Sequence, residues 1–126
     1  MWREKAIEAL MLKNLKLTPQ RLKLIDIIEE IGKKHPTFGE ILEKIRKDFP
    51  TTSFSTLYTN ILIFKELGLI EVFTVGNETR IETNLKPHMN VYDDEIRDCQ
   101  DDEILRKIEE RIGKKIKLVI VIPDQR

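Results

Sequence analysis

Side chains that bind metals are concentrated in the stretch RIETNLKPHMNVYDDEIRDCQ, residues 80–100. It holds Glu82, His88, Cys99 and several further acids, in a chain of 126 residues with only two histidines and one cysteine. Imidazole, thiolate and carboxylate groups are the protein ligands of zinc, iron and manganese. The stretch is therefore a metal site, the remains of one, or a strand, a turn and an acidic loop that happen to contain ligand-type residues.

A second candidate surface lies in TTSFSTLYTN, residues 51–60, which contains no charged residue. We expect Ser53 to cap a helix here, because serine side chains accept hydrogen bonds from the free N–H groups of a first helical turn. The first turns would then expose Ser55, Thr56, Tyr58, Thr59 and Asn60. Such side chains can contact base edges and thymine methyls in a DNA major groove, whereas in an isolated helix they would simply form a polar, solvated face.

Composition limits which proteins can carry these sites. With 40% hydrophobic and 35% charged residues, the chain is typical of packed proteins and not of disordered ones. No apolar run approaches the roughly 20 residues of a membrane helix, and the amino terminus lacks a signal-peptide cleavage site, so we expect a cytoplasmic protein without a membrane partner. A single cysteine excludes an internal disulfide and a structural zinc site built from CxxC pairs.

Charge is unevenly distributed although the formal net charge is zero. Residues 1–25 are rich in lysine and arginine, whereas residues 93–103 carry seven acids and only Arg97 as a base. The amino-terminal part could approach a polyanion, and the acidic segment would repel one. Both runs could equally be solvated surface.

Hydrophobic periodicity predicts four helices followed by a β-hairpin. The helices are expected within residues 3–16, 18–32, 37–49 and 53–67, and the hairpin strands within 69–75 and 79–83 around the turn at 76–78. The first helix would bury Ile7, Leu10, Met11 and Leu15. Helices followed by a hairpin form a winged helix-turn-helix, in which the last helix before the wing enters the major groove.

Residues 85–126 are predicted to form a strand, strand, helix, strand unit. Its helix, DDEILRKIEERIG, would bury Ile104, Leu105, Ile108 and Ile112, and its last strand contains the apolar run LVIVI. About 40 residues cannot bury a core of their own, so we expect a symmetric dimer to cover it. The predicted fold class is α+β, with a winged-helix DNA-binding domain at 1–84 and a small α/β dimerisation domain at 85–126.

Several motifs occur in the order and spacing of the ferric uptake regulator family. They are LTPQR, HP fourteen residues after Arg21, FPTTSFSTLYTNILIFKELGLI, the wing, RIET and PH. The chain resembles this family most strongly over residues 13–92. The resemblance implies a homodimeric, metal-responsive winged-helix transcription regulator whose partner is double-stranded DNA.

The resemblance also implies roles in DNA binding for individual residues. Tyr58 matches the tyrosine that contacts bases, Lys16 the lysine that reaches the minor groove, and Arg21 the arginine of the TPQR motif at the DNA backbone. Thr59 occupies a position that is usually arginine, so a strong guanine contact is missing. Together with Ser55 and Thr56, these residues form the predicted DNA-binding set, with an altered sequence preference.

A regulatory metal site between the domains is implied in the same way. His35, Glu82 and His88 match three of its ligands, Asn90 replaces a histidine, and Asp101 is a candidate for the acid from the second domain. This set suits one divalent zinc, iron or manganese ion per protomer, held with reduced affinity because one imidazole is lost. Each ligand alone also has a structural interpretation, as a backbone partner, a solvated side chain or one half of an ion pair.

The single cysteine is not expected to bind a metal. The family's structural zinc site is absent, and Cys99 is better explained as an ordinary small residue or surface thiol than as a ligand. No catalytic constellation or glycine-rich phosphate loop is present, so we expect neither an enzyme nor a small-molecule substrate. The competing function is a metal-independent protein-interaction module whose acidic segment binds a basic partner; binding to duplex DNA that weakens with salt would separate the two.

Overall fold

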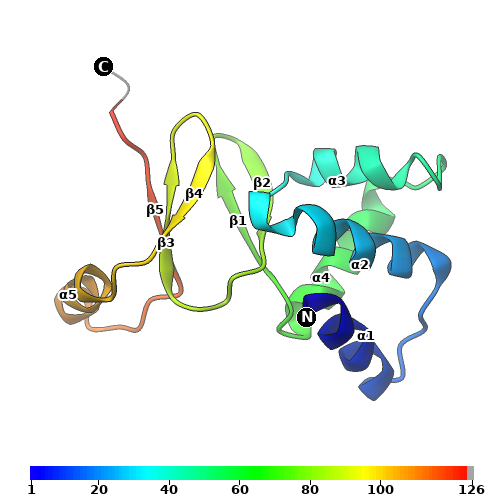
Figure 1. Cartoon of the computed structure of the whole chain (residues 1–126), viewed down its shortest axis with the longest axis horizontal. Coiled ribbons are helices and arrows are strands. Elements are labelled where there is room, and N and C mark those ends of the chain that lie inside the picture. The colour runs from blue at the N-terminus through cyan, green and yellow to red at the C-terminus, as the bar shows by residue number, and fades with distance from the viewer. Residues whose placement is uncertain (125–126) are drawn as a thin grey trace. The chain divides into compact units, whose positions relative to one another are not determined.

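The structure is a computed structural model, described over residues 1–124, and it contains two compact units, residues 1–84 and 85–126 (Figure 1). Unit 1 contains α1 (Trp2–Leu12), α2 (Pro19–Ile31), the short 3₁₀ helix η1 (Gly32–Lys34), α3 (Phe38–Ile45), α4 (Phe54–Glu66), β1 (Glu71–Val75) and β2 (Glu78–Glu82). Unit 2 contains β3 (His88–Tyr92), β4 (Ile96–Cys99), α5 (Asp102–Ile112) and β5 (Leu118–Val121). This mixture of helices and sheets confirms the predicted α+β class.

Capping side chains fix where helices of unit 1 begin, and Ser53 is the cap that was predicted. The Thr18 hydroxyl accepts from the backbone N–H of Arg21 at 3.2 Å, and Ser53 accepts from Thr56 at 3.1 Å. Thr37 forms a complete capping box with the side chain of residue 40. These side chains satisfy donors that have no partner inside their helices, which fixes where α2, α3 and α4 begin.

The hydrophobic core of unit 1 corrects the predicted face of the first helix. Leu10 is buried as expected, but Met11 is 61% exposed and Ala6 is buried in its place. Trp2 accounts for this change of the buried face. Its indole N–H donates to the carbonyl of Leu69 at 2.9 Å, so the side of α1 that faces the core contains Trp2, Ala6 and Leu10.

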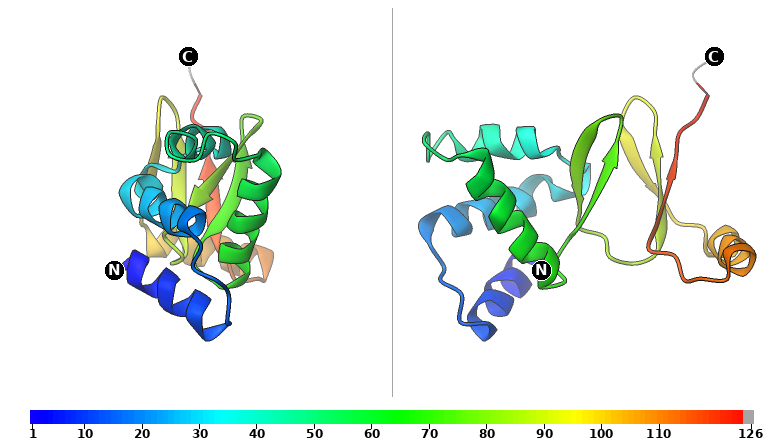
Figure 2. Two further views of the ribbon diagram at one scale, coloured as in Figure 1. Left: turned by 90° about the vertical axis from the view of Figure 1, so that its right-hand side faces the viewer. Right: turned by 180° about the vertical axis from the view of Figure 1, so that it is seen from behind.

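The wing is an antiparallel hairpin in the predicted position. Glu71 pairs with Glu82 at one end of the ladder and Val75 with Glu78 at the other. The two turn residues, glycine 76 and asparagine 77, both have positive φ, as a two-residue hairpin turn requires. The right-hand view of Figure 2 shows α4 leading into this hairpin. Strand β2 is also tied to the turn before α3, since the N–H of Ile81 donates to a carbonyl there at 3.2 Å.

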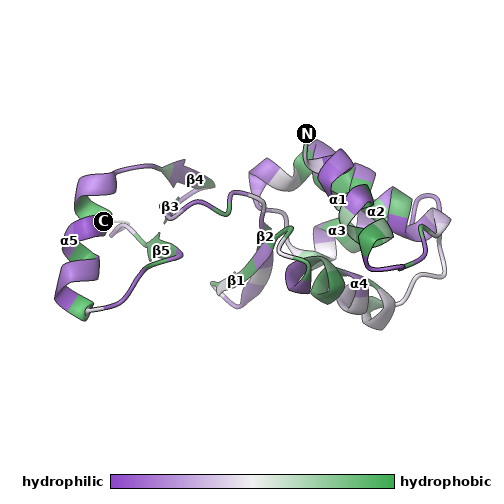
Figure 3. Cartoon of the chain, turned by 90° about the horizontal axis from the view of Figure 1, so that it is seen from below, coloured by the Kyte–Doolittle hydropathy of each residue, from purple (hydrophilic) through white to green (hydrophobic). Residues whose placement is uncertain are grey.

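Unit 2 is a three-stranded sheet in the order β4-β3-β5, with α5 connecting β4 to β5. Strand β3 pairs antiparallel with β4 and parallel with β5. Of the four residues predicted to point inward from α5, Leu105 is buried, Ile108 is half-buried, and Ile104 and Ile112 are 44% and 55% exposed. Hydrophobic residues are interspersed with hydrophilic ones along α5 (Figure 3), and a unit this small leaves some of them uncovered. Across residues 1–124, no helix is long and apolar enough to cross a membrane.

Candidate DNA-reading surface and metal-binding residues

The first turns of α4 form an exposed polar and aromatic surface. All four residues predicted to read DNA from this helix are exposed: Ser55, Thr56, Tyr58 and Thr59. Leu57, on the other side of the same turn, is buried in the core. The helix therefore separates an inward apolar stripe from an outward set of hydroxyls, as its capping position and periodicity predict.

Arg21 connects this helix to the loop before α2. Its Nε donates to Oδ1 of Asn60 at 2.9 Å, and its Nη1 donates to the backbone carbonyl of Lys16 at 2.9 Å. Asn60 in turn donates from Nδ2 to the carbonyl of Thr56 at 3.1 Å. Two of the guanidinium donors thus position the protein itself. Arg21 places Lys16 beside α4, a role that the sequence did not reveal because Asn60 lies 39 residues away.

A hollow of about 520 Å³ opens between this loop and α4. It is lined by Asn14, Leu15, Lys16, Thr18, Gln20, Arg21, Thr56, Thr59 and Asn60. The lining combines hydroxyls, amides and two positive side chains, which are the groups that contact phosphate and sugar oxygens in protein–DNA interfaces.

The positive charge of residues 1–25 is partly neutralised within unit 1. Arg3 pairs with Asp26 at 2.7 Å, and Lys23 pairs with Asp48 at 2.6 Å. The hydrogen bond and charge of each carboxylate raise the pKa of its basic partner. Arg3 and Lys23 are therefore less available to a polyanion than the sequence suggests, whereas Lys16 and Arg21 line the hollow.

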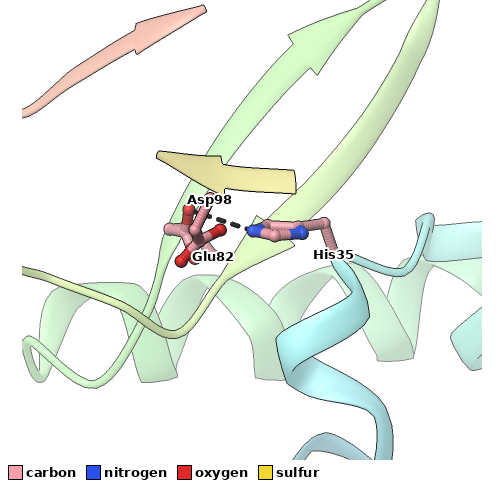
Figure 4. Close-up of side chains that lie close together, drawn as sticks. All are labelled: His35, Glu82 and Asp98. Atoms are coloured by element: carbon pink, nitrogen blue, oxygen red, sulfur yellow. Dashed lines mark ion pairs between the residues drawn. The ribbon is translucent and has the colours of Figure 1, made fainter. Parts of the chain in front are cut away.

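His35 and Glu82 form a buried imidazole–carboxylate pair in unit 1. Their Nε2 and Oε1 atoms are 3.3 Å apart, and the two side chains are only 2% and 3% exposed (Figure 4). Glu82 ends β2, and its other oxygen accepts from the N–H of Asn84 at 3.1 Å. An imidazole nitrogen and a carboxylate oxygen this close are donors that zinc, iron or manganese can share.

Backbone contacts fix His35 in an uncommon conformation. Its φ is 55°, in the left-handed region that few residues other than glycine adopt. Arg80 of β2 donates from Nη1 to the His35 carbonyl at 2.9 Å. At the start of η1, a Cβ on Gly32 would lie 2.8 Å from Cγ2 of Thr83, so glycine permits the residue that follows β2 to approach this closely. The wing strand therefore positions His35 as well as supplying Glu82.

His88 and Asp98 form the corresponding pair in unit 2. Nδ1 of His88 lies 2.6 Å from the carbonyl of Lys86, and because a carbonyl only accepts, Nδ1 carries the proton and Nε2 is the basic nitrogen. Nε2 lies 4.0 Å from Oδ2 of Asp98. A backbone acceptor on the far nitrogen is the usual support of a metal-binding histidine.

Asp101, the acid predicted from this unit, has a structural role. Its carboxylate accepts from the N–H of Ile104 at 3.1 Å and caps α5. Asp98 of β4 was not among the residues predicted from sequence. The signal lies in the register: Asp98 is directly opposite Asn90, two residues from His88 on the same face of β3.

Comparison with known proteins identifies the family. The model of the ferric uptake regulator family matches residues 12–121. The chain belongs to this family. The ferric uptake regulation protein homolog of Archaeoglobus fulgidus is 52% identical over 127 residues, covering 100% of this chain and 99% of that protein. The peroxide-responsive repressor PerR of Staphylococcus aureus is 30% identical over 89 residues, covering 70% and 60%.

Solved structures agree with the family in fold. The Helicobacter pylori ferric uptake regulator Fur, described with three functional metal-binding sites, superposes with a TM-score of 0.73 at 20% identity, covering 98% of this chain and 90% of that one. A zinc-bound manganese uptake regulator superposes with a TM-score of 0.67 at 23% identity, covering 98% of each chain. The predicted resemblance is confirmed, and ferric uptake regulator family proteins are transcription regulators, not enzymes.

Proposed function

We propose that this ferric uptake regulator family member is a cytoplasmic, homodimeric, sequence-specific DNA-binding regulator that responds to a divalent metal. The observation that carries the proposal is the exposed hydroxyl and aromatic face of α4, the last helix of a helix-turn-helix and the helix directly before a wing. A helix in this position is the one that winged-helix proteins place in the major groove.

Each predicted DNA-binding residue has a distinct task in this proposal. Ser55, Thr56, Tyr58 and Thr59 contact base edges. Lys16 reaches the minor groove from the loop that Arg21 holds beside α4. The guanidinium N–H groups of Arg21 that do not bond to Asn60 or to the carbonyl of Lys16 reach the phosphates. Hydroxyls contact several bases, and Thr59 replaces the arginine that would select guanine, so the operator preference differs from that of relatives with arginine there.

Unit 2 is proposed to be the dimerisation domain. Across residues 85–124, its large exposed apolar residues are Leu85 before β3, Ile104 and Ile112 on α5, and Val121 and Ile122 at the end of β5. Covering this surface with a second copy would supply the core that about 40 residues cannot form alone.

The metal response is proposed to use the two imidazole–carboxylate pairs. His35 and Glu82 in unit 1 and His88 in unit 2 are the ligands, and Asp98 is a better candidate than Asp101 because the Asp101 carboxylate is engaged by α5. This donor set fits a zinc, iron or manganese ion. Bound metal would supply a link that stabilises one conformation of the protein over others, and such differential binding is how a ligand shifts a regulator between states.

The competing interaction module receives less support from the acidic segment. Many of its acids already serve partners within unit 2: Asp93 pairs with Arg97, Asp101 caps α5, Asp102 accepts from Gln100, and Glu103 pairs with Lys107. A surface whose carboxylates are satisfied internally gains less from a basic partner, because those contacts must be exchanged.

Selection from a random duplex library, followed by salt titration, tests DNA binding. The wild-type chain should enrich a sequence, and log affinity should fall linearly with log salt as phosphate contacts release counterions. Tyr58→Ala should weaken binding to the enriched duplex by about 1 to 3 kcal/mol without changing the far-UV circular dichroism. No enrichment and no salt dependence would favour the interaction module instead.

Calorimetry tests the metal ligands. Zinc should bind the wild type, and His35→Ala and His88→Ala should each lower its affinity by an order of magnitude or more, on the order of 1.4 kcal/mol. Asp98→Asn should weaken binding more than Asp101→Asn, whose main effect should be on the stability of α5. Equal and negligible binding by wild type and both histidine variants would refute the metal proposal while leaving DNA binding intact.

A further inference from the structure

Two aromatic side chains are exposed side by side at the start of α4. Phe54 and Tyr58 are 52% and 44% exposed, although both are large and partly apolar. They are four residues apart, so they lie one helical turn apart on one face, and their rings stack with centroids 6.1 Å apart and planes at 22°. Tyr58 belongs to the DNA-binding set predicted from sequence, and Phe54 does not.

A buried ring holds this pair in place. Phe38, at the first position of α3, is 5% exposed and lies 6.3 Å from Phe54 and 6.1 Å from Tyr58, centroid to centroid. Phe38 belongs to the buried core of unit 1, whereas Phe54 lies outside that core. Aromatic side chains supported in this way present a rigid surface and lose little conformational entropy on binding.

The neighbouring side chains on this face cannot distinguish bases strongly. Residues 51–60 carry no charge, and the outward residues beside the pair are Ser55, Thr56 and Thr59. Serine and threonine hydroxyls pair with more than one base, whereas the bidentate contacts of arginine, asparagine or glutamine are selective. Asn60, the amide of this segment, is bonded to Arg21 and to the helix backbone. Apolar contact with the thymine methyl is a selective interaction that the two aromatic rings can make.

We propose that Phe54 and Tyr58 together read the C5-methyl groups of thymines in the major groove, which makes Phe54 a specificity-determining residue. The inference rests on the proposed function, because α4 must enter the groove. Successive bases on a DNA strand are about 3.4 Å apart along the helix axis. The 6.1 Å between the two ring centroids is therefore longer than one base step and shorter than two. The rings can therefore contact thymines at neighbouring or next-neighbouring positions.

Removal of single methyl groups from the DNA tests the inference. The full-length chain selects a duplex from a random library, and each thymine of that duplex is then replaced by uracil, which lacks only the methyl. Wild-type affinity should fall about fourfold at each contacted thymine, the effect of exposing one buried methyl group. In Phe54→Ala, at least one of these positions should become insensitive to the replacement, because the methyl and the ring act as a pair.

Two further variants control the experiment. Leu12→Ala removes an exposed apolar side chain from α1 and should keep the full uracil sensitivity of the wild type. Phe54→Leu keeps an apolar contact and should keep part of it. Thermal melts show that each variant is folded.

The outcomes separate this inference from the proposed function. Equal uracil sensitivity in wild type and Phe54→Ala would overturn the role of Phe54, and so would a selected duplex in which no thymine is sensitive. In both cases DNA binding itself would stand. Failure of the wild type to enrich any sequence would overturn the proposed function, and this inference with it.

Discussion

Units 1 and 2 differ most in how completely they bury their hydrophobic residues. The continuous core of unit 1 brings together side chains from α1, α2, α3, α4, the turn after α4 and the wing strand β2. Within residues 85–124, the buried hydrophobic residues are Met89 and Leu105. A unit of 84 residues can enclose a core, whereas one half that size leaves much of its apolar surface open. Unit 1 therefore encloses a hydrophobic core of its own, whereas unit 2 leaves apolar residues of α5 and β5 exposed.

The largest expected effect comes from breaking the core of unit 1. Phe64 is fully buried in α4, with the Trp2 ring edge-on at 6.2 Å. Phe64→Ala should lower the free energy of unfolding by about 3 to 5 kcal/mol, through lost burial and the remaining cavity. Phe54→Ala on the exposed face of the same helix should cost less than about 1 kcal/mol. Urea titration of both variants measures the difference; similar losses would mean that Phe54 belongs to the core.

Negative charges in place of the exposed apolar residues of α5 should prevent a second copy of the chain from covering unit 2. Ile104 and Ile112 lie two turns apart on one face and are both exposed. The double variant I104D/I112D should weaken dimerisation by about 2 kcal/mol or more, because carboxylates lose hydration when an apolar interface forms. Arg106→Asp, which makes the same change in net charge on the opposite side of α5, is the control. Sedimentation equilibrium measures the mass, and an unchanged dimer in I104D/I112D would show that this face is not the covered surface.

Arg80 tests whether unit 1 positions a metal ligand through its wing. Its side chain is largely buried, and it donates to the carbonyl of His35. Arg80→Ala should lower the free energy of unfolding by about 1 to 2 kcal/mol and weaken zinc binding about tenfold, because the left-handed conformation of His35 loses its support. Arg97→Ala, which removes an exposed arginine, should change neither quantity appreciably. Urea titration and calorimetry give the two readouts; unchanged zinc affinity in Arg80→Ala would limit Arg80 to stability.

The smallest effect is the titration of an exposed pair in unit 2. A hydrogen bond from Arg97, 3.0 Å away, lowers the pKa of Asp93 below its ordinary value. A lowered pKa in the folded state contributes stability that is present above the unfolded pKa and is lost as the pH falls through the folded one. The effect is thus confined to below about pH 4. In an NMR titration Arg97→Ala should raise the pKa of Asp93; an unchanged pKa would show that the pair does not persist in solution.

Local chemistry explains which parts of the fold could be predicted from sequence. The caps at Thr18, Thr37 and Ser53 and the turn of the wing depend on residues within four positions of one another, so their interactions follow from spacing alone. The rotation of α1 could not be predicted in this way. It depends on the indole of Trp2 bonding to Leu69, 67 residues away.

The same difference between local and long-range interactions applies to the candidate sites. The types of candidate DNA-contacting and metal-binding side chains were evident from motifs, and the structure brings two of the candidates, His35 and Glu82, together. Asp98 was missed because only the pairing of β3 with β4 brings it near His88. Phe54 was missed because an apolar residue at a helix start is expected to be buried, and only the position of Phe38 leaves it exposed.

By itself, then, the sequence determined the order of elements, the family and the chemical types at both candidate sites, since capping, periodicity and motif spacing are properties of neighbouring residues. The tertiary structure alone decided which partners those side chains have. Arg21 holds the Lys16 loop, Arg80 supports His35, and Phe38 supports the exposed aromatic pair. These contacts join residues distant in the chain, and their geometry depends on how the elements pack, which no local pattern encodes.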